Sequence, residues 1–466
     1  MGAEPQSMRY VSTRGSAPVL GFTDALLAGL ADDGGLYVPA EWPALPPRAP
    51  AATYAQRAAQ IIQLFVGDDL PAATVQRLCD EAYATFAHPA VVPLVQIGDQ
   101  HFVQELFHGP TLAFKDVALQ LVGRLFDEVL RARGTRVTIV GATSGDTGSA
   151  AIDGVKDCAN VDIVILYPHG RTSDVQRKQM TTVVSPNVRV VAVEGTFDDC
   201  QDMVKAMFND VEFRERMQLS AVNSINWARV MAQIVYYVVL TDLLAGPVNV
   251  CVPSGNFGNV FSGWIARRMG APIDQLVVAA NANDILERFI NNNDMTAAPV
   301  VPSLSPSMDI QVSSNFERLL FEMNGRDGGL TAEQLQRFRA SGHLSVEQDQ
   351  RAEFIEGRFQ AARLDDTETL AVISRTYSDT GMLLDPHTAV GVGAVAKLRA
   401  AGTLHGTTVT LATAHPAKFP DAVERATGVR PPLPPHLTDL FELPEQFTVL
   451  PHDLAAVKEF VATTFL

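Results

Sequence analysis

Residues 248–269 read VNVCVPSGNFGNVFSGWIARRM, and this stretch decides the fold class. Its apolar, β-branched start predicts a strand over Val248–Val252, and a helix is predicted over Val260–Met269. The glycine-rich loop between them, Pro253–Asn259, would aim unpaired backbone N–H groups and the positive end of a helix dipole at one point. Such a unit can hold a phosphate without a lysine. The loop has neither the lysine of a nucleoside-triphosphate-binding loop nor a full GxGxxG pattern, and the alternative interpretation is a tight βα turn without a ligand.

Short apolar runs alternate with longer amphipathic stretches on both sides of this unit. Further strands are predicted at 137–140, 163–166, 188–193, 276–280 and 408–411. These runs are almost continuously apolar, as in strands that helices cover on both faces. Helices are predicted over 116–133 and 226–244, and the helical spacing of 53–86 predicts a separate N-terminal helical subdomain. The alternation indicates an α/β fold with a mostly parallel sheet.

A second loop, Gly141–Ser149, reads GATSGDTGS and has the same setting, after a predicted strand and before a helix rich in small residues. We name it the threonine loop. Its hydroxyls and the backbone donors of a helix start suit a carboxylate or another small anion, and the ligand would be a substrate rather than a cofactor. The alternative interpretation is a helix N-cap with a glycine turn.

The third segment is HGPTLAFKD at His108–Asp116, where Lys115 lies among apolar residues at a predicted helix start. A lysine in this place opposes the helix dipole, which lowers the pKa of its amine and favours the neutral form that attacks carbonyls. A Schiff-base lysine would use that property. The alternative is an exposed lysine at the start of a helix.

The composition excludes several classes of protein. The chain has 466 residues, of which 47% are hydrophobic and 19% charged, so it is long and apolar enough to fold as two or three domains. Its 36 basic against 52 acidic residues give a net charge of −16, which argues against nucleic acid as a partner. No apolar run approaches the roughly 20 residues of a membrane span. Four widely spaced cysteines without a CxxC pair predict buried free thiols and a cytoplasmic protein.

Taken together and in order, the segments resemble the long form of the pyridoxal-phosphate-dependent threonine synthases. The matching motifs cover nearly the whole chain: YVSTRG at 10–15, DGGLYVP at 33–39, FHGPTLAFKD at 107–116, ATSGDTGSA at 142–150, GRTSDVQ at 170–176, NSINWAR at 223–229, PSGNFGN at 253–259 and TAHPAKF at 413–419. The resemblance implies a fold-type-II enzyme with two open, twisted, mostly parallel sheets flanked by helices and an extra N-terminal helical subdomain. We expect an N-terminal subdomain at 1–93, a large cofactor domain at 94–128 and 225–466, and a smaller α/β substrate domain at 129–224.

The reaction that the resemblance implies converts O-phospho-L-homoserine and water to L-threonine and phosphate, by γ-elimination and β-addition of water. Lys115 would hold pyridoxal phosphate as a Schiff base and then act as a base at Cα. The glycine-rich loop would bind the cofactor phosphate through Ser254, Gly255, Asn256, Phe257, Gly258 and Asn259. Thr413 would meet the pyridine nitrogen with a neutral hydroxyl.

The resemblance also assigns the substrate contacts. Thr143, Ser144, Asp146 and Thr147 would meet the substrate carboxylate, with Asp146 near either the cofactor's ring oxygen or the substrate. Asn223, Ser224 and Arg229 would grip the substrate phosphate, since an arginine fork suits that group. Arg177 and Lys178 are further cations, with a solvated surface position as the alternative. The histidines resemble no metal set, so no metal is expected.

Two other functions stay open on the sequence alone. One is a relative in the same class that eliminates or replaces at Cβ, such as a serine/threonine dehydratase or a cysteine synthase. The long N-terminal region and the second phosphate site argue against it. The other is a non-catalytic protein of this family that still binds cofactor or phosphoester, which an intact Lys115 and Thr413 disfavour.

Overall fold

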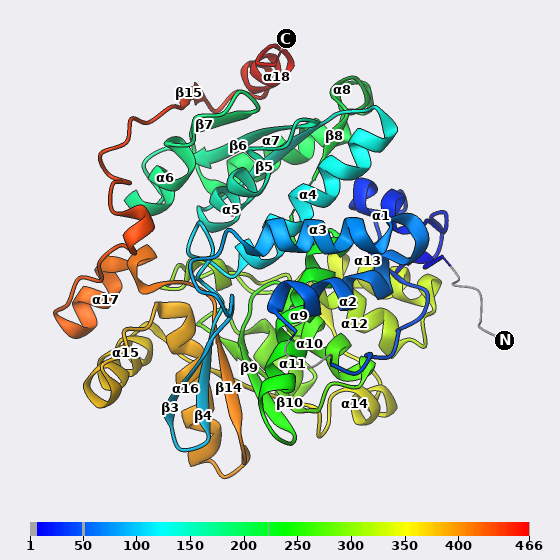
Figure 1. The fold of residues 1–466 in the computed structure, drawn as a ribbon. Helices are drawn as coiled ribbons and strands as arrows, with labels where there is room; N and C mark the ends of the chain where they lie inside the picture. The colour runs from blue at the N-terminus through cyan, green and yellow to red at the C-terminus, as the bar shows by residue number, and fades with distance from the viewer. Residues whose placement is uncertain (1–6, 49–51, 222, 466) are drawn as a thin grey trace.

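The computed structural model describes residues 7–48, 52–221 and 223–465. Within these residues the strands form two large sheets, in the lower and upper parts of Figure 1, and two small two-stranded sheets. The first large sheet has the order β13-β10-β9-β14-β4-β3, and the second has the order β15-β7-β6-β5-β8. Helices surround both, which confirms the predicted α/β class with two mostly parallel sheets.

The elements have the following bounds in chain order. The strands are β1 (Tyr10–Ser12), β2 (Tyr37–Pro39), β3 (Leu94–Gly98), β4 (His101–Glu105), β5 (Val137–Ala142), β6 (Val161–Pro168), β7 (Val188–Glu194), β8 (Leu219–Ser220), β9 (Val248–Pro253), β10 (Ile273–Ala280), β11 (Met295–Thr296), β12 (His343–Leu344), β13 (Phe359–Arg363), β14 (Thr408–Ala412) and β15 (Thr448–Pro451). The α-helices are α1 (Phe22–Ala28), α2 (Tyr54–Val66), α3 (Ala72–Tyr83), α4 (Lys115–Arg133), α5 (Asp146–Val155), α6 (Asp174–Thr181), α7 (Phe197–Asn209), α8 (Val211–Met217), α9 (Trp227–Leu243), α10 (Gly258–Met269), α11 (Ile285–Asn292), α12 (Phe316–Met323), α13 (Gly328–Ser341), α14 (Gln348–Phe354), α15 (Asp366–Thr380), α16 (Pro386–Ala400), α17 (Pro420–Thr427) and α18 (Leu454–Thr463).

The first sheet is buried on both faces. Cys251 and Val277 pack in one apolar cluster with α16, whereas Val250 and Val278 pack in another with α9 and α10. Neighbouring strands β13, β10, β9, β14 and β4 pair in parallel, and β3 runs antiparallel to β4. The continuous apolar character of these strands follows from this double cover.

The second sheet is also covered on both faces and pairs in parallel throughout its described strands. Val164 and Val191 belong to a cluster with α7 and α18, whereas Ile163 and Val190 belong to the cluster that includes α4 and α5. Strand β15, near the C-terminus, pairs with β7, so the end of the chain returns to this sheet, as its red colour in Figure 1 shows. Our expected division assigned that segment to the large domain.

The N-terminal region is helical as predicted, and residues 53–86 contain the two helices α2 and α3. Helix α2 ends at Val66, its C-cap Gly67 has a φ of 57°, and Pro71 is the N-cap of α3. Both helices pack against the body of the molecule, α2 on α9 and α3 on α4. Arg57 of α2 forms an ion pair of 2.8 Å with Asp242 of α9. The region therefore shares its core with the sheet domains.

Several strands were not predicted because their sequences mix polar and apolar residues. In β4 the polar side chains of His101 and Gln104 are buried. Each has a partner that sequence cannot show: His101 Nε2 lies 2.9 Å from Thr410 Oγ1, and Gln104 Nε2 donates to Tyr236 O at 3.1 Å. Burial of a polar group is tolerated when it is hydrogen-bonded, so a buried strand can look amphipathic in sequence.

The four cysteines are buried free thiols, as predicted. Burial raises the pKa of Cys79 and Cys158 to about 12, which keeps these groups protonated and unreactive. In the part of the chain that the structure describes, no helix combines the length and apolar character needed to cross a membrane.

The fold places three loops at the carboxyl ends of parallel strands. The threonine loop begins in β5, the glycine-rich loop follows β9, and Thr413 follows β14 directly. Ligands of open α/β sheets bind in the crevice at this edge.

Candidate active site

Lys115 is the first residue of α4, and backbone pairing sets its position. The N–H of Phe114 donates to Thr413 O at 2.8 Å, and Ala113 forms a β-bridge with Ala414. The turn before Lys115 therefore lies against the segment after β14. The structure thus brings together the segments of Lys115 and Thr413, which are far apart in the sequence.

The Lys115 amine is buried, so the alternative of an exposed lysine is wrong. Burial lowers the pKa of Lys115; the carboxylate of Asp146, 3.4 Å from Nζ, opposes this, and the charges of Lys418 and Arg229 lower the pKa further. The net effect favours the neutral amine, as the sequence analysis expected.

Asp146 is the first residue of α5 and is also buried. Its Oδ2 faces Lys115 and accepts a hydrogen bond from Ser307 Oγ at 3.2 Å. Its Oδ1 accepts from Gln176 Nε2 at 2.9 Å and lies 3.0 Å from Lys418 Nζ. Burial alone would raise the pKa of Asp146, but the charges of Lys418 and Lys115 hold it well below its usual range. The carboxylate is therefore ionised and has partners on both oxygens.

Lys418 is a site residue that the sequence analysis did not single out. It belongs to the TAHPAKF motif, and its side chain is 0% exposed. Lysine is almost never fully buried unless it is paired, so a single lysine in a short helical turn is expected to be exposed. Its position inside a matched motif and between apolar neighbours was the available signal. We call Lys115, Asp146 and Lys418 the lysine cluster.

The glycine-rich loop has the geometry of an anion cradle. Phe257 has a left-handed backbone with a φ of 63°, and its N–H donates to Ser254 Oγ at 3.2 Å. Among the described residues, the amides of Gly255, Asn256, Gly258 and Asn259 have no hydrogen-bond acceptor in the protein. Successive unpaired amides at a helix start attract an anion. The interpretation as a mere turn leaves these four donors unexplained.

The far end of the loop is rigidly held. Asn259 is buried, and its Oδ1 accepts hydrogen bonds from the hydroxyls of Tyr236 and Tyr237. Its Nδ2 is buried without a partner in the described part of the protein. An unpaired buried amide donor costs free energy, so it indicates a ligand beside the loop.

Ser307 connects the loop to the lysine cluster. A Cβ built on Gly255 would lie 3.2 Å from Ser307 O and 3.1 Å from Met308 Cα, so the backbone passes close here. The hydroxyl of the same Ser307 donates to Asp146. The loop and the cluster therefore border one site.

The side chains of the threonine loop differ in burial. Thr143 is buried, and its Oγ1 accepts from the amides of Gly145 and Gly148, both at 2.9 Å. Ser144 is exposed and Thr147 is half-buried. Thr143 thus shapes the loop and keeps its own hydroxyl proton available for a ligand.

The three residues expected at the substrate phosphate differ in environment. Arg229 is buried in α9, and burial lowers its pKa to about 10. Asn223 is exposed, and its Oδ1 accepts from the amide of Ile225 at 3.2 Å; Ser224 is half-buried. The positive charge of Arg229 contributes to the lowered pKa of Lys115.

Arg177 and Lys178 contact the C-terminal segment. Arg177 pairs with Glu445, and Lys178 Nζ donates to the carbonyls of Phe441 and Leu443 at 3.2 and 3.0 Å. Their charges are thus already used to hold that segment.

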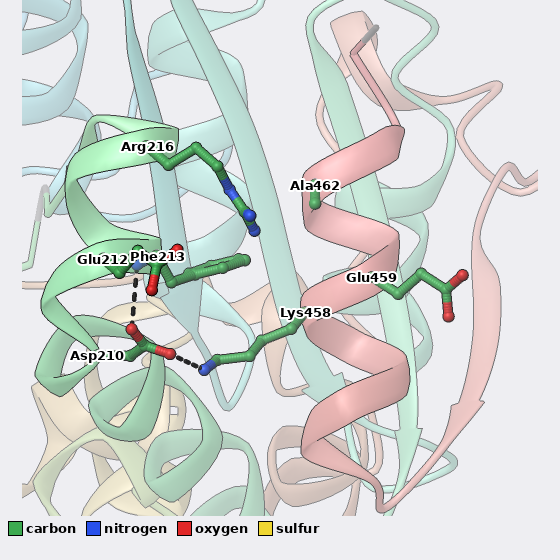
Figure 2. Close-up of a pocket in the computed structure, with 7 residues that line it drawn as sticks. All are labelled: Asp210, Glu212, Phe213, Arg216, Lys458, Glu459 and Ala462. Atoms are coloured by element: carbon green, nitrogen blue, oxygen red, sulfur yellow. Dashed lines mark hydrogen bonds and ion pairs between the residues drawn. The ribbon is translucent and has the colours of Figure 1, made fainter.

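A separate hollow of about 270 Å³ lies between α8 and α18, shown in Figure 2. An ion pair of Asp210 with Lys458 crosses it, and the Lys458 ammonium lies 5.1 Å from the centroid of the Phe213 ring. It is lined by none of the predicted site residues within the described chain. It plays no part in the site.

Family models match three consecutive parts of the chain. Residues 9–83 match the threonine synthase N terminus, 90–354 a pyridoxal-phosphate-dependent enzyme, and 388–461 the C-terminal part of threonine synthase. The second of these spans more than half of the chain and includes both Lys115 and the glycine-rich loop.

Whole proteins give the same result. A threonine synthase from Pseudomonas aeruginosa is 53% identical over 98% of both chains, and one from Saccharomyces cerevisiae is 42% identical over 90% of this chain and 89% of its own. The crystal structure of a pyridoxal-phosphate-bound threonine synthase from Brucella melitensis has a TM-score of 0.94 and 51% identity, and it covers 98% of this chain and 99% of its own. A threonine deaminase from Solanum lycopersicum, at a TM-score of 0.51 and 12% identity, shares the fold alone. The chain belongs to the threonine synthase family of fold-type-II, pyridoxal-phosphate-dependent enzymes.

Proposed function

We propose that this protein is a threonine synthase that converts O-phospho-L-homoserine and water to L-threonine and phosphate. The observation that carries the proposal is the buried Lys115 amine, held beside Asp146 and joined through Ser307 to a loop with four unpaired amides. A reactive amine and an anion cradle are the two groups that a pyridoxal-phosphate enzyme needs. The family membership selects the reaction among those that this cofactor supports.

The residues present fit pyridoxal phosphate. Lys115 would hold it covalently, the amides of Gly255, Asn256, Gly258 and Asn259 would receive its phosphate, and Ser254 and Phe257 would shape the loop. Thr413, buried next to the Lys115 turn, would face the pyridine nitrogen with its hydroxyl. When bound, the cofactor supplies an electron sink for the carbon next to the substrate amine.

The protein's own contribution is to move protons and to orient the substrate. Once displaced by the substrate amine, Lys115 Nζ would be neutral and could take the proton from Cα and return protons along the substrate. The depressed pKa of this amine supports that role.

We further propose how the substrate is held. Thr143, Ser144 and Thr147 would border its carboxylate, with the free hydroxyl proton of Thr143 available as a donor, and Asp146 would lie near the cofactor's ring oxygen or the substrate. Asn223, Ser224 and Arg229 would bind its phosphate, and buried Arg229 provides the charge.

Two other predictions stay proposals. Buried free thiols support a cytoplasmic location. The pairing of β15 with β7 supports moving the C-terminal strand and α18 from the large domain to the smaller one, with the other expected boundaries kept.

The test is a product analysis on the purified protein with pyridoxal phosphate. O-phospho-L-homoserine should give threonine and phosphate in equal amounts, whereas L-serine and L-threonine should give little 2-oxo acid. Rapid 2-oxo acid formation from L-serine or L-threonine, with no phosphate released from O-phospho-L-homoserine, would favour the dehydratase. Cofactor binding without turnover of any of the three would favour a non-catalytic protein.

A further inference from the structure

We propose that Lys418 is a positioning residue whose ammonium group cancels the charge of Asp146 at the Lys115 amine. The inference deepens the proposed function and rests on it in one respect, that Lys115 is the reactive amine.

Three segments of the chain contact the Lys418 ammonium group. Its Nζ donates to Thr111 O at 2.7 Å and to Gln179 Oε1 at 3.0 Å, and it lies 3.0 Å from Asp146 Oδ1. Two hydrogen bonds and one ion pair therefore hold the ammonium group beside Asp146. The three partners come from the turn before Lys115, from α6 and from the start of α5.

The Asp146 carboxylate lies close enough to Lys115 to affect the charge state of its amine, and Lys418 opposes that effect. A lone carboxylate 3.4 Å from Lys115 Nζ would hold that amine in its charged form, which cannot act as nucleophile or base. Lys418 lies at the other oxygen of the same carboxylate. Lys115 therefore faces an ion pair with no net charge instead of a bare anion, and burial can then act on the amine.

Two further charged or titratable groups act on the lysine cluster. Arg229 of α9 acts on Lys115, and His387 of α16 acts on Asp146. His387 Nδ1 lies 2.8 Å from Asp385, and its Nε2 accepts from the amide of Ser307.

Asp116 is a further carboxyl group near the cluster. It accepts from the amide and hydroxyl of Thr111, at 2.8 and 2.7 Å, and so fixes the carbonyl that Lys418 contacts. Its oxygens point to Thr111 and not to the Lys115 amine. Asp146 and Lys418 are therefore the opposed charges whose removal should act on Lys115 in opposite directions.

The test measures the titration of Lys115 in the full chain freed of cofactor. Trace acetic anhydride, which reacts with neutral amines, is applied from pH 6 to 11, and acetylation of the Lys115 peptide is read against that of Lys205, an exposed lysine in the same digest. Lys418→Met should move the Lys115 midpoint to a pH about 1 to 3 units higher. Asp146→Asn should move it lower, the double variant should return it near the wild-type value, and Lys418→Arg should stay near wild type because the charge is kept.

Opposite shifts in the two single variants support the proposal, and equal or absent shifts overturn it. If Lys418→Met does not fold, Asp146→Asn decides alone, because an unchanged or raised midpoint there contradicts the charge balance. In the holoenzyme the acid limb of the kcat profile should move in the same directions. The acetylation assay contains no substrate, so a failed threonine synthase assay leaves its outcome interpretable.

Discussion

The glycine-rich loop and the lysine cluster handle charge in opposite ways. The loop, Pro253–Asn259, would attract an anion with the four unpaired backbone amides of Gly255, Asn256, Gly258 and Asn259, and it contains no charged side chain. The cluster uses three charged side chains from distant parts of the chain; Lys418 bonds to the carbonyl of a residue 307 positions away. The loop is a local structure that any strand–loop–helix of this sequence would tend to form. The cluster exists only when the whole fold is assembled.

This difference predicts that binding and chemistry can be separated. The loop should hold the cofactor when the cluster is broken, and the cluster should keep its protonation behaviour when the loop is weakened. Lys115→Ala and Gly255→Val test that separation, and Arg229→Ala and Glu445→Gln change residues outside both regions. The four are given from the largest expected effect to the smallest.

Lys115→Ala should abolish turnover while cofactor is still bound non-covalently. Loss of the amine removes a base whose contribution is typically about 10²- to 10⁴-fold. Phosphate release from O-phospho-L-homoserine measures the loss, and cofactor content after gel filtration measures binding. The surface variant Lys205→Ala is the control. Loss of both activity and binding in a folded Lys115→Ala protein would show that the loop alone does not retain the cofactor.

Arg229→Ala should lower kcat/KM for O-phospho-L-homoserine by roughly ten- to hundredfold, with unchanged cofactor binding. A hydrogen bond to a charged group is worth about 1.5–3 kcal/mol, and about 1.4 kcal/mol corresponds to tenfold. Steady-state kinetics and the cofactor's absorbance are measured on one preparation. Arg229→Lys, which keeps the charge, should recover part of the loss, and normal kinetics in Arg229→Ala would remove this arginine from the phosphate site.

Gly255→Val should weaken cofactor retention by about ten- to hundredfold. The new Cβ would meet Ile310 Cδ1 at 2.9 Å and the Met308 backbone at 3.1 Å, and such overpacking costs about 1–3 kcal/mol. Titration of cofactor-free protein with pyridoxal phosphate measures the affinity. Gly98→Val is the matched control, because a Cβ there meets only His101 Cβ at 3.8 Å. Equal affinities in the two variants would mean that the cofactor phosphate binds elsewhere.

Glu445→Gln lies outside both regions and should have the smallest effect. It weakens a partly exposed pair with Arg177, and such pairs contribute about 0.2–1 kcal/mol. A small decrease in the urea midpoint with unchanged kcat/KM is expected. Asp202→Asn, which removes a more exposed partner of Lys205, is the comparison. A fall in kcat/KM would show that Arg177 and the C-terminal segment contribute to the site.

Local features explain how much the sequence could predict. Six strands, the long helices α4 and α9 and the loop after β9 were predicted because their signals lie within one segment: apolar runs, helical spacing, and glycines between a strand and a helix. The hairpin β3–β4 was missed, since His101 and Gln104 become buried only when Thr410 and Tyr236 supply their partners. Strand β15 was missed because its place is set by β7, far away in the chain.

The features of the site likewise divide into those that one sequence segment can predict and those that depend on tertiary structure. The sequence alone predicted Lys115 as a candidate reactive amine and the glycine-rich loop as a candidate anion cradle, because a lysine at a helix start and amides at a helix N-terminus act through their own segments. The family resemblance favoured these roles over an exposed lysine and a plain turn. Tertiary structure alone decided that Asp146 faces Lys115 and that Lys418 faces Asp146. Electrostatic interactions depend on separation in space and on burial, and neither is written in the spacing of residues along the chain. A lysine that looks like a surface residue in sequence thereby becomes a fully buried charge at the centre of the site.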